Sequence, residues 1–138
     1  MLECLIIGDS LAVGVGQIRK ECVTHAVSGI NSYDYVNRFV MHTKGDTHAK
    51  TTIISLGSND TKNIDTYEEL DTLRQQVAGR VYWILPNIKE TKRKAVWMVA
   101  QKHGDHVIDA RNYDRSPDAV HPTYKGYKGI ADETRKVN

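Results

Sequence analysis

Five short runs of apolar residues alternate along the chain with segments whose apolar residues recur every three or four positions. A short apolar run closed by glycine or proline is typical of a buried strand, and the longer period is typical of an amphipathic helix. The expected strands are 2–7, 23–27, 51–56, 81–85 and 106–109. This alternation predicts right-handed βαβ units, and therefore an α/β fold in which a five-stranded parallel sheet lies between two layers of helices.

Helices with one apolar face are expected between these runs. The first is predicted over 10–22, where Gly14 and Gly16 would let the helix pack closely against the sheet. Ser32 is expected to cap the next helix, and Thr66 with Glu69 forms a capping box for the one after it. The inward-facing residues expected on the helices that follow 10–22 are Tyr35, Val36, Phe39, Val40, Leu70, Leu73, Val77, Ala95, Val96, Val99, Ala100, Tyr127, Ile130, Ala131 and Thr134.

Length and composition favour one globular domain over residues 1–138. A chain of 138 residues can bury a sizeable core, and 40% hydrophobic with 26% charged residues is ordinary for a globular protein. The net charge of +2, spread along the chain, gives no electrostatic pattern for nucleic acid. The basic segment 89–94 is interpreted as a solvated helix face.

The two cysteines and the start of the chain bear on location. Cys4 and Cys22 have no metal-ligand spacing, and we expect buried thiols instead of a disulfide framework. Met1 is followed at once by the first strand, with no secretion signal ahead of it, and no apolar run is long enough to span a membrane. The sequence therefore predicts a cytoplasmic protein, unless it is released by cell lysis or within a larger particle.

Ser10 follows the first predicted strand, in the stretch Gly8-Asp9-Ser10-Leu11. At a strand-to-helix turn, the N–H groups of the helix start and its dipole favour negative charge. Ser10 could therefore attack a carbonyl while its own amide holds part of the oxyanion. The alternative is that Ser10 only caps the helix with its hydroxyl.

Gly29 and Asn59 follow the second and third predicted strands. If the strands are parallel, both residues lie at the same edge of the sheet as Ser10. A glycine lets its backbone N–H approach a ligand closely, and the NH₂ group of Asn59 is a neutral donor, so both suit an oxyanion hole. The alternative is that both are ordinary turn residues.

Asp118 and His121 lie in the polar loop 110–122, before the last helix. Among six histidines, only His121 belongs to an Asp-x-x-His-Pro arrangement. A spacing of three in a turn lets the carboxylate hold one imidazole nitrogen while the other takes a proton from Ser10. The alternative is a capped turn beside a surface histidine. The remaining histidines show no metal-ligand spacing, so no metal site is predicted.

Taken together, the blocks at Ser10, Gly29, Asn59 and Asp118 to His121 resemble the SGNH (GDSL) hydrolase family of serine esterases and acylhydrolases. They span 8–122 in the order and spacing of that family, and Gly57-Ser58-Asn59-Asp60 matches its Gly-x-Asn-Asp block in full. The resemblance implies a flavodoxin-like strand order 2-1-3-4-5. It also implies Ser10, His121 and Asp118 as catalytic residues, Ser10, Gly29 and Asn59 as the oxyanion hole, and no cofactor.

The function predicted on this basis is hydrolysis of carboxylic esters through an acyl-enzyme on Ser10. The substrate would be a small molecule or a glycan that carries short acyl groups, for example acetyl groups on carbohydrate. The alternative is an inactive glycan- or peptide-binding module on the same fold. A phosphate-accepting signalling domain lacks support because only Asp9, and no acidic pair, follows the first strand. Ala119 replaces a glycine common in the family, a change expected to be harmless.

Overall fold

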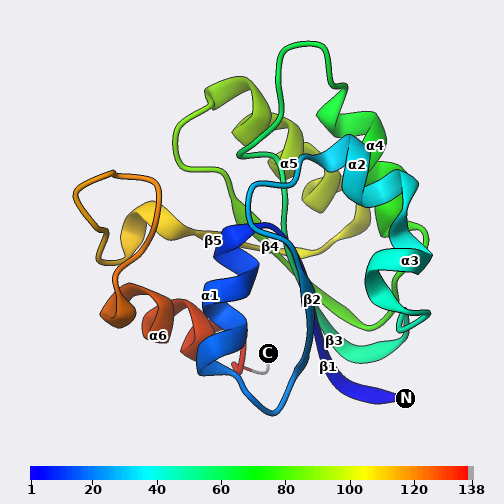
Figure 1. The fold of residues 1–138 in the computed structure, drawn as a ribbon, viewed down its shortest axis with the longest axis horizontal. Helices are drawn as coiled ribbons and strands as arrows, with labels where there is room; N and C mark the ends of the chain where they lie inside the picture. The colour runs from blue at the N-terminus through cyan, green and yellow to red at the C-terminus, as the bar shows by residue number, and fades with distance from the viewer. Residues whose placement is uncertain (137–138) are drawn as a thin grey trace.

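The computed structural model describes residues 1–136 and places a parallel sheet at the centre of the molecule (Figure 1). Its strands are β1 (Leu2–Gly8), β2 (Val23–Ala26), β3 (Ala49–Ser55), β4 (Arg80–Leu85) and β5 (His106–Asp109). All neighbouring strands are parallel, in the order β2-β1-β3-β4-β5. The predicted α/β fold and its strand order are confirmed.

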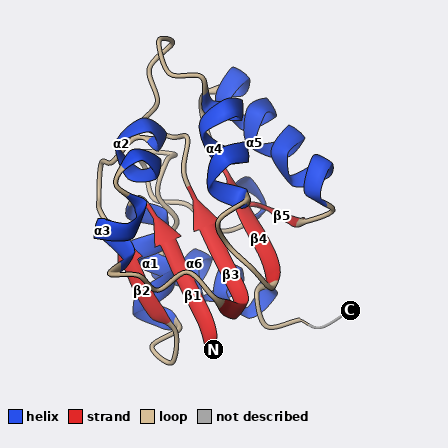
Figure 2. Ribbon diagram, turned by 90° about the vertical axis from the view of Figure 1, so that its right-hand side faces the viewer, coloured by secondary structure: helices blue, strands red, loops and turns tan. Residues whose placement is uncertain are grey.

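Helices cover both faces of the sheet (Figure 2). They are α1 (Ser10–Ile18), α2 (Ser32–Asn37), α3 (Phe39–Thr43), α4 (Thr66–Arg74), α5 (Glu90–His103) and α6 (Tyr124–Glu133). Helices α1 and α6 lie on one face, and α2 to α5 lie on the other. None of the helices within residues 1–136 is both long and apolar enough to cross a lipid bilayer.

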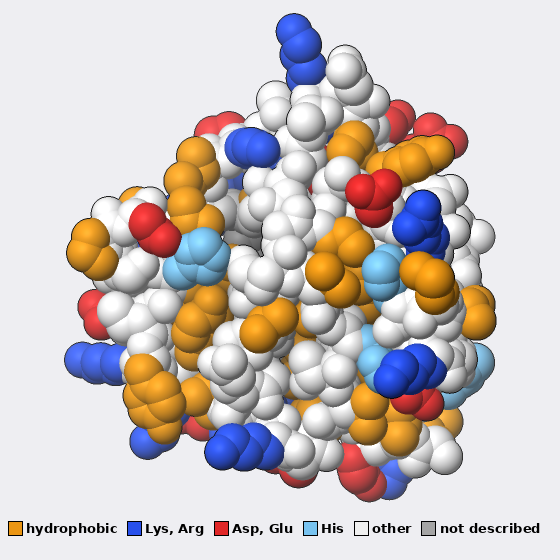
Figure 3. Space-filling model, viewed as in Figure 1, with side chains coloured by type: hydrophobic (Ala, Val, Ile, Leu, Met, Phe, Trp, Pro, Cys, Tyr) orange, Lys and Arg blue, Asp and Glu red, His pale blue; other side chains and the backbone are white. Residues whose placement is uncertain are grey.

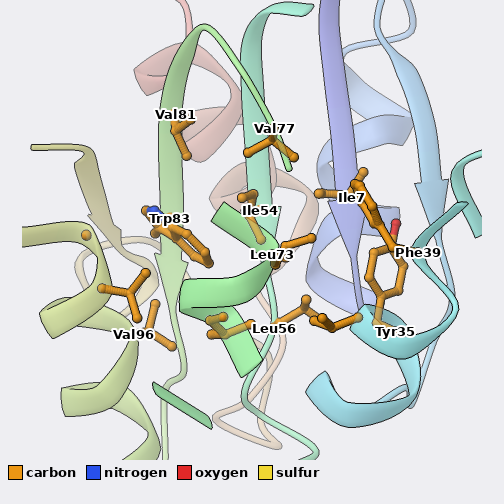
Figure 4. Close-up of a cluster of buried hydrophobic side chains, with 14 of the residues drawn as sticks. Ile7, Tyr35, Phe39, Ile54, Leu56, Leu73, Val77, Val81, Trp83 and Val96 are labelled. Atoms are coloured by element: carbon orange, nitrogen blue, oxygen red, sulfur yellow. The ribbon is translucent and has the colours of Figure 1, made fainter. Parts of the chain in front are cut away.

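Each face of the sheet has its own hydrophobic cluster, because successive side chains of a strand point to opposite faces. From β1, Leu5 and Ile7 pack under α2 to α5, whereas Cys4 and Ile6 pack under α1 and α6. Trp83 of β4 is fully buried in the first cluster (Figure 4). Burial on both faces explains the nearly continuous apolar runs that identified the strands.

The helix boundaries differ from the predictions where polar side chains form hydrogen bonds other than the expected ones. Asn31 caps α2 and Asp65 caps α4, so neither Ser32 nor Thr66 is a cap, and the capping box with Glu69 is not formed. The Thr66 hydroxyl instead donates to the Asp60 carboxylate at 2.7 Å.

The helix predicted after Ser32 is interrupted at Arg38, which separates α2 from α3. This break turns Val40 outward, where it is 65% exposed, so its predicted burial is wrong. Helix α1 is also shorter than predicted, since it ends at Ile18.

Two glycines of α1 allow close packing, against two different elements. A Cβ atom at Gly14 would overlap the Tyr127 ring of α6, and one at Gly16 would overlap the Thr24 side chain of β2. The predicted close approach to the sheet therefore holds for Gly16. At Gly14 the tight contact is between two helices.

A disulfide bond joins Cys4 of β1 to Cys22 in the turn before β2, which corrects the prediction of free buried thiols. The two positions are 18 residues apart, but the return of the chain after α1 brings their Cα atoms to 4.8 Å. Sequence spacing alone does not reveal that proximity. Disulfides persist mainly in oxidising compartments, so this bond weighs against the predicted cytoplasmic location.

We expect reduction of this disulfide to lower the melting temperature of the protein. Closing a loop of this length removes entropy from the unfolded chain worth about 3 kcal/mol. Thermal unfolding followed by circular dichroism, with and without reductant, measures the effect. The double variant Cys4→Ala/Cys22→Ala should melt at the same temperature with and without reductant. An unchanged melting temperature of the reduced wild type would contradict the expectation.

Candidate active site

Three of the predicted site residues lie just beyond the carboxyl ends of neighbouring strands. Ser10 follows β1, Gly29 follows β2 and Asn59 follows β3, and all three line one pocket of about 430 Å³. His121 lines the same pocket from the loop before α6. Figure 3 shows a hollow on this face of the molecule with a histidine side chain at its edge. Ligands of open parallel sheets bind at this edge.

The turn that presents Ser10 depends on both residues before it. Gly8 has a φ of 130°, and a Cβ atom there would overlap the Ser55 carbonyl oxygen of β3, so only glycine fits. Asp9 is the N-cap of α1, and its Oδ1 accepts a hydrogen bond from the Leu11 N–H at 3.1 Å. The alternative interpretation of Ser10 as the cap is therefore wrong, and its hydroxyl is available to other partners.

The Ser10 hydroxyl begins a chain of hydrogen bonds. Its Oγ lies 2.9 Å from Nε2 of His121, and Nδ1 of His121 lies 2.8 Å from Oδ2 of Asp118. The structure thus brings together three residues from the two ends of the sequence. Such an arrangement can remove a proton from a hydroxyl while the carboxylate fixes the orientation of the imidazole.

Asp118 is held by donors on its other oxygen. Its Oδ1 accepts hydrogen bonds from the N–H groups of Val120 and His121, both at 2.9 Å, and from the Ser116 hydroxyl at 2.8 Å. The backbone N–H and the imidazole of His121, followed by Ser116 and Val120, lower the pKa of Asp118 well below its usual range. The carboxylate is therefore ionised at neutral pH.

Ala119 sits at the centre of this turn with a φ of 61°, in the left-handed region. A side chain in that conformation costs about 1 kcal/mol, which explains why a glycine suits the position. The substitution expected to be harmless therefore has a cost in stability.

Hydrogen bonds hold the loop that carries Asn59 beside Ser10. Nδ2 of Asn59 donates to the Ile30 carbonyl at 3.0 Å, which leaves its second hydrogen for the pocket. Neighbouring Asp60 is 1% exposed and accepts hydrogen bonds from the Ser32 N–H and the Thr66 hydroxyl, both at 2.7 Å. Asp60 thereby ties the loop that carries Asn59 to the first residues of α2 and α4.

Asn87 is a further residue of the pocket that the sequence did not single out. It follows β4, is 6% exposed, and donates from Nδ2 to the Val120 carbonyl at 2.7 Å. Because Val120 directly precedes His121, this bond connects the end of β4 to the histidine loop. The signal in the sequence was a polar residue just past a predicted strand, and Asn87 was interpreted only as part of the turn that ends this strand.

Asp9 is a fully buried carboxyl group next to Ser10. Burial raises its pKa to about 6, although hydrogen bonds from Ser55 and Leu11 oppose the shift, and nearby Asp60 adds to it. Its Oδ2 has no hydrogen-bond partner among the described residues. The carboxyl group therefore gains a proton more readily in the folded protein than in the unfolded chain.

We expect Asp9 to make the protein more stable at pH 4 than at pH 7. A raised folded-state pKa gives stability that is complete below the unfolded pKa and lost as pH rises through about 6, on the order of 2 to 3 kcal/mol in all. Urea unfolding of wild type and Asp9→Asn across this range tests it. The variant should show a smaller loss, and exposed Asp34→Asn should behave as wild type. Equal pH dependence in wild type and Asp9→Asn would contradict the assignment.

Within residues 1–136, no group of three or more His, Cys, Asp or Glu side chains is placed to hold a metal ion. Two histidines away from the pocket each pair with a single carboxylate, His25 with Asp46 and His103 with Asp71.

The strand order β2-β1-β3-β4-β5 is the one expected for the fold of the SGNH hydrolases, and comparison with solved structures agrees. A GDSL-like lipase from Bacteroides thetaiotaomicron superposes with a TM-score of 0.71 at 13% identity, over 95% of this chain and 84% of that one. A carbohydrate acetylesterase from Sinorhizobium meliloti gives 0.60 at 15% identity, over 96% and 98%.

The catalytic domain of a peptidoglycan O-acetyltransferase from Streptococcus pneumoniae is also similar, with a TM-score of 0.60 at 16% identity, over 94% of this chain and 88% of that domain. No protein-family model matches the sequence, and no curated protein matches it. At these identities, the likeness shows that the chain has the fold of the GDSL lipases and acylhydrolases.

Proposed function

We propose that this chain is an SGNH hydrolase that cleaves carboxylic esters through an acyl-enzyme on Ser10. The observation that carries the proposal is the hydrogen-bond chain from Ser10 through His121 to Asp118, in a pocket that Gly29 and Asn59 also line. The folds of the lipase, the acetylesterase and the acetyltransferase domain support the same chemistry.

In the first half of the reaction, His121 takes the proton of Ser10 as its Oγ attacks the ester carbonyl carbon. The N–H groups of Ser10 and Gly29 and the free amide hydrogen of Asn59 donate to the oxyanion. The carbon–oxygen bond to the alcohol then breaks, and the leaving oxygen takes the proton from His121. Asp118, ionised throughout, stabilises the imidazolium that exists between these steps.

In the second half, water attacks the acyl carbon and gives its proton to His121. The bond to Ser10 breaks, Oγ regains the proton, and the carboxylic acid leaves. An acceptor alcohol in place of water would give acyl transfer by the same steps. Ile88 and Val120 supply apolar contacts in the pocket, and the folds of the acetylesterase and the O-acetyltransferase domain support a short acyl group such as acetyl.

Labelling with a fluorophosphonate tests the proposal against its alternative, an inactive binding module. An activated serine forms a covalent bond to phosphorus with loss of fluoride, so we expect one adduct on Ser10 by mass spectrometry. His121→Ala should label much more slowly because its serine has no base. Absence of an adduct on the wild type, together with no hydrolysis of p-nitrophenyl acetate, would support the binding module.

A further inference from the structure

A second groove adjoins the Ser10 pocket. It has a volume of about 590 Å³ and lies between the loop that follows β3 and the start of α5. Lys89 lines both the groove and the Ser10 pocket, so the two spaces are neighbours at this residue. The residues of this lysine groove are Asp60, Thr61, Lys62, Lys89, Thr91 and Lys92.

Three of these residues are lysines without an acidic partner. The ion pairs found among residues 1–136 include none with Lys62, Lys89 or Lys92. Nζ of Lys89 donates to the Asp60 carbonyl at 2.9 Å, and Nζ of Lys92 donates to the Ile64 carbonyl at 2.7 Å. Each ammonium has three hydrogens, so both lysines are held in place with donors to spare.

Two nearby acidic groups, Asp60 and Glu90, have partners other than the groove lysines. The Asp60 carboxylate is buried and accepts hydrogen bonds from Ser32 and Thr66. Lys89 donates to the backbone carbonyl of Asp60 and not to this carboxylate. Glu90 pairs with Arg111 at 3.1 Å on another side of α5. The groove therefore presents positive charge, and Figure 3 shows Lys or Arg side chains over the loop after β3 and the start of α5.

This arrangement changes the interpretation of the basic segment 89–94 as one solvated helix face. Lys89, the N-cap of α5, and Lys92, in its first turn, both line the groove. Arg93 instead pairs with Asp109, and Lys94 lines a separate hollow with Trp97. The segment therefore divides, and only part of it serves the groove.

We propose that the lysine groove binds an anionic group, a carboxylate or a phosphate, on the alcohol part of the ester, so that the substrate is an acylated anionic carbohydrate. The inference rests on the proposed function. The groove meets the Ser10 pocket at Lys89, which suits the alcohol part of a substrate whose acyl group lies beside Ser10. Lysines act as point charges for carboxylate and phosphate and raise the local concentration of an anionic substrate.

The test compares acetate release from an acetylated methyl glucuronoside, an acetylated glucose phosphate and the neutral acetylated methyl glucoside. At low salt we expect kcat/KM for at least one charged substrate to exceed that for the neutral one by roughly 10-fold or more. The preference should shrink as salt is added. Comparison of the two charged substrates identifies the anion, and equal kcat/KM for all three would overturn the proposal.

Variants locate the preference. Lys62→Gln/Lys89→Gln/Lys92→Gln should bring the ratio of charged to neutral kcat/KM close to one, and Lys62→Gln alone, which breaks no described hydrogen bond, should lower it in part. Lys94→Gln, on the same helix but outside the groove, should retain the ratio. A ratio that survives the triple substitution would overturn the proposal.

Two measurements separate failure of the groove from failure of the proposed function. Hydrolysis of uncharged p-nitrophenyl acetate reports on the Ser10 chemistry alone. Titration of Ser10→Ala with the acetylated glucuronoside and glucoside, followed by NMR chemical shifts, reports on the groove without turnover. Tighter binding of the charged sugar supports the groove even if no ester is cleaved, and equal binding overturns it.

Discussion

Ser10→Ala should lower the turnover of p-nitrophenyl acetate by about 10⁴-fold or more, down to the level that the oxyanion donors alone provide. The methyl group cannot form the acyl-enzyme, and His121 loses the group 2.9 Å from its Nε2. Because Ser10 is the first residue of α1 and Asp9 is its cap, the fold should not depend on this hydroxyl. Initial rates at matched protein concentration, with thermal unfolding of both proteins, provide the measurement.

Ser28→Ala is the matched control for that experiment. Ser28 lines the same pocket and is exposed, but it has no imidazole partner among the described residues. Its replacement should cost no more than a few-fold in turnover. If Ser10→Ala retains the rate of the wild type, the serine mechanism fails, and hydrolysis would have to be assigned to another group.

Much of the fold could be predicted because strands that are buried on both faces are apolar at nearly every position. Runs such as 81–85 are apolar at every position, and Gly or Pro closes them. The exact ends of the strands could not be predicted, since they depend on pairing with the neighbouring strand. β3 begins at Ala49, two residues before its predicted start, because Ala49 pairs with Leu2 of β1.

The disulfide could not be predicted for a related reason. Whether Cys4 and Cys22 meet depends on how far α1 extends before the chain turns back. The predicted helix over 10–22 would have placed Cys22 inside a helix. The actual helix ends at Ile18, and the turn that follows brings the two sulfur atoms together.

The site residues also differ in how far the sequence could predict their positions. Ser10, Gly29 and Asn59 follow predicted strands, so the parallel topology alone brings them to one edge of the sheet. The positions of Asn87 and of the lysine groove depend on which loops pack against each other. The basic segment 89–94 has no periodicity that shows which of its side chains face the groove. Their contributions become visible only when the loops after β3, β4 and β5 are placed together.

Asn59→Ala should lower kcat by roughly 10²- to 10³-fold, the usual cost of removing one oxyanion donor. The substitution removes the only side-chain amide among the three proposed donors. It also removes the hydrogen bond from Asn59 to the Ile30 carbonyl, which lies next to Gly29, so the second donor could shift as well. The loss should appear in kcat more than in KM, because the oxyanion exists only near the transition state.

Asn63→Ala separates this effect from a general disturbance of the loop. Asn63 is exposed in the same loop and does not line the Ser10 pocket, so its replacement should leave kcat unchanged. Fluorophosphonate labelling adds a second readout, since the phosphoryl oxygen of the adduct occupies the place of the oxyanion. Asn59→Ala should therefore label more slowly while Ser10 and His121 remain intact. Wild-type kcat and labelling in Asn59→Ala would remove the carboxamide from the oxyanion hole and leave only the two backbone donors.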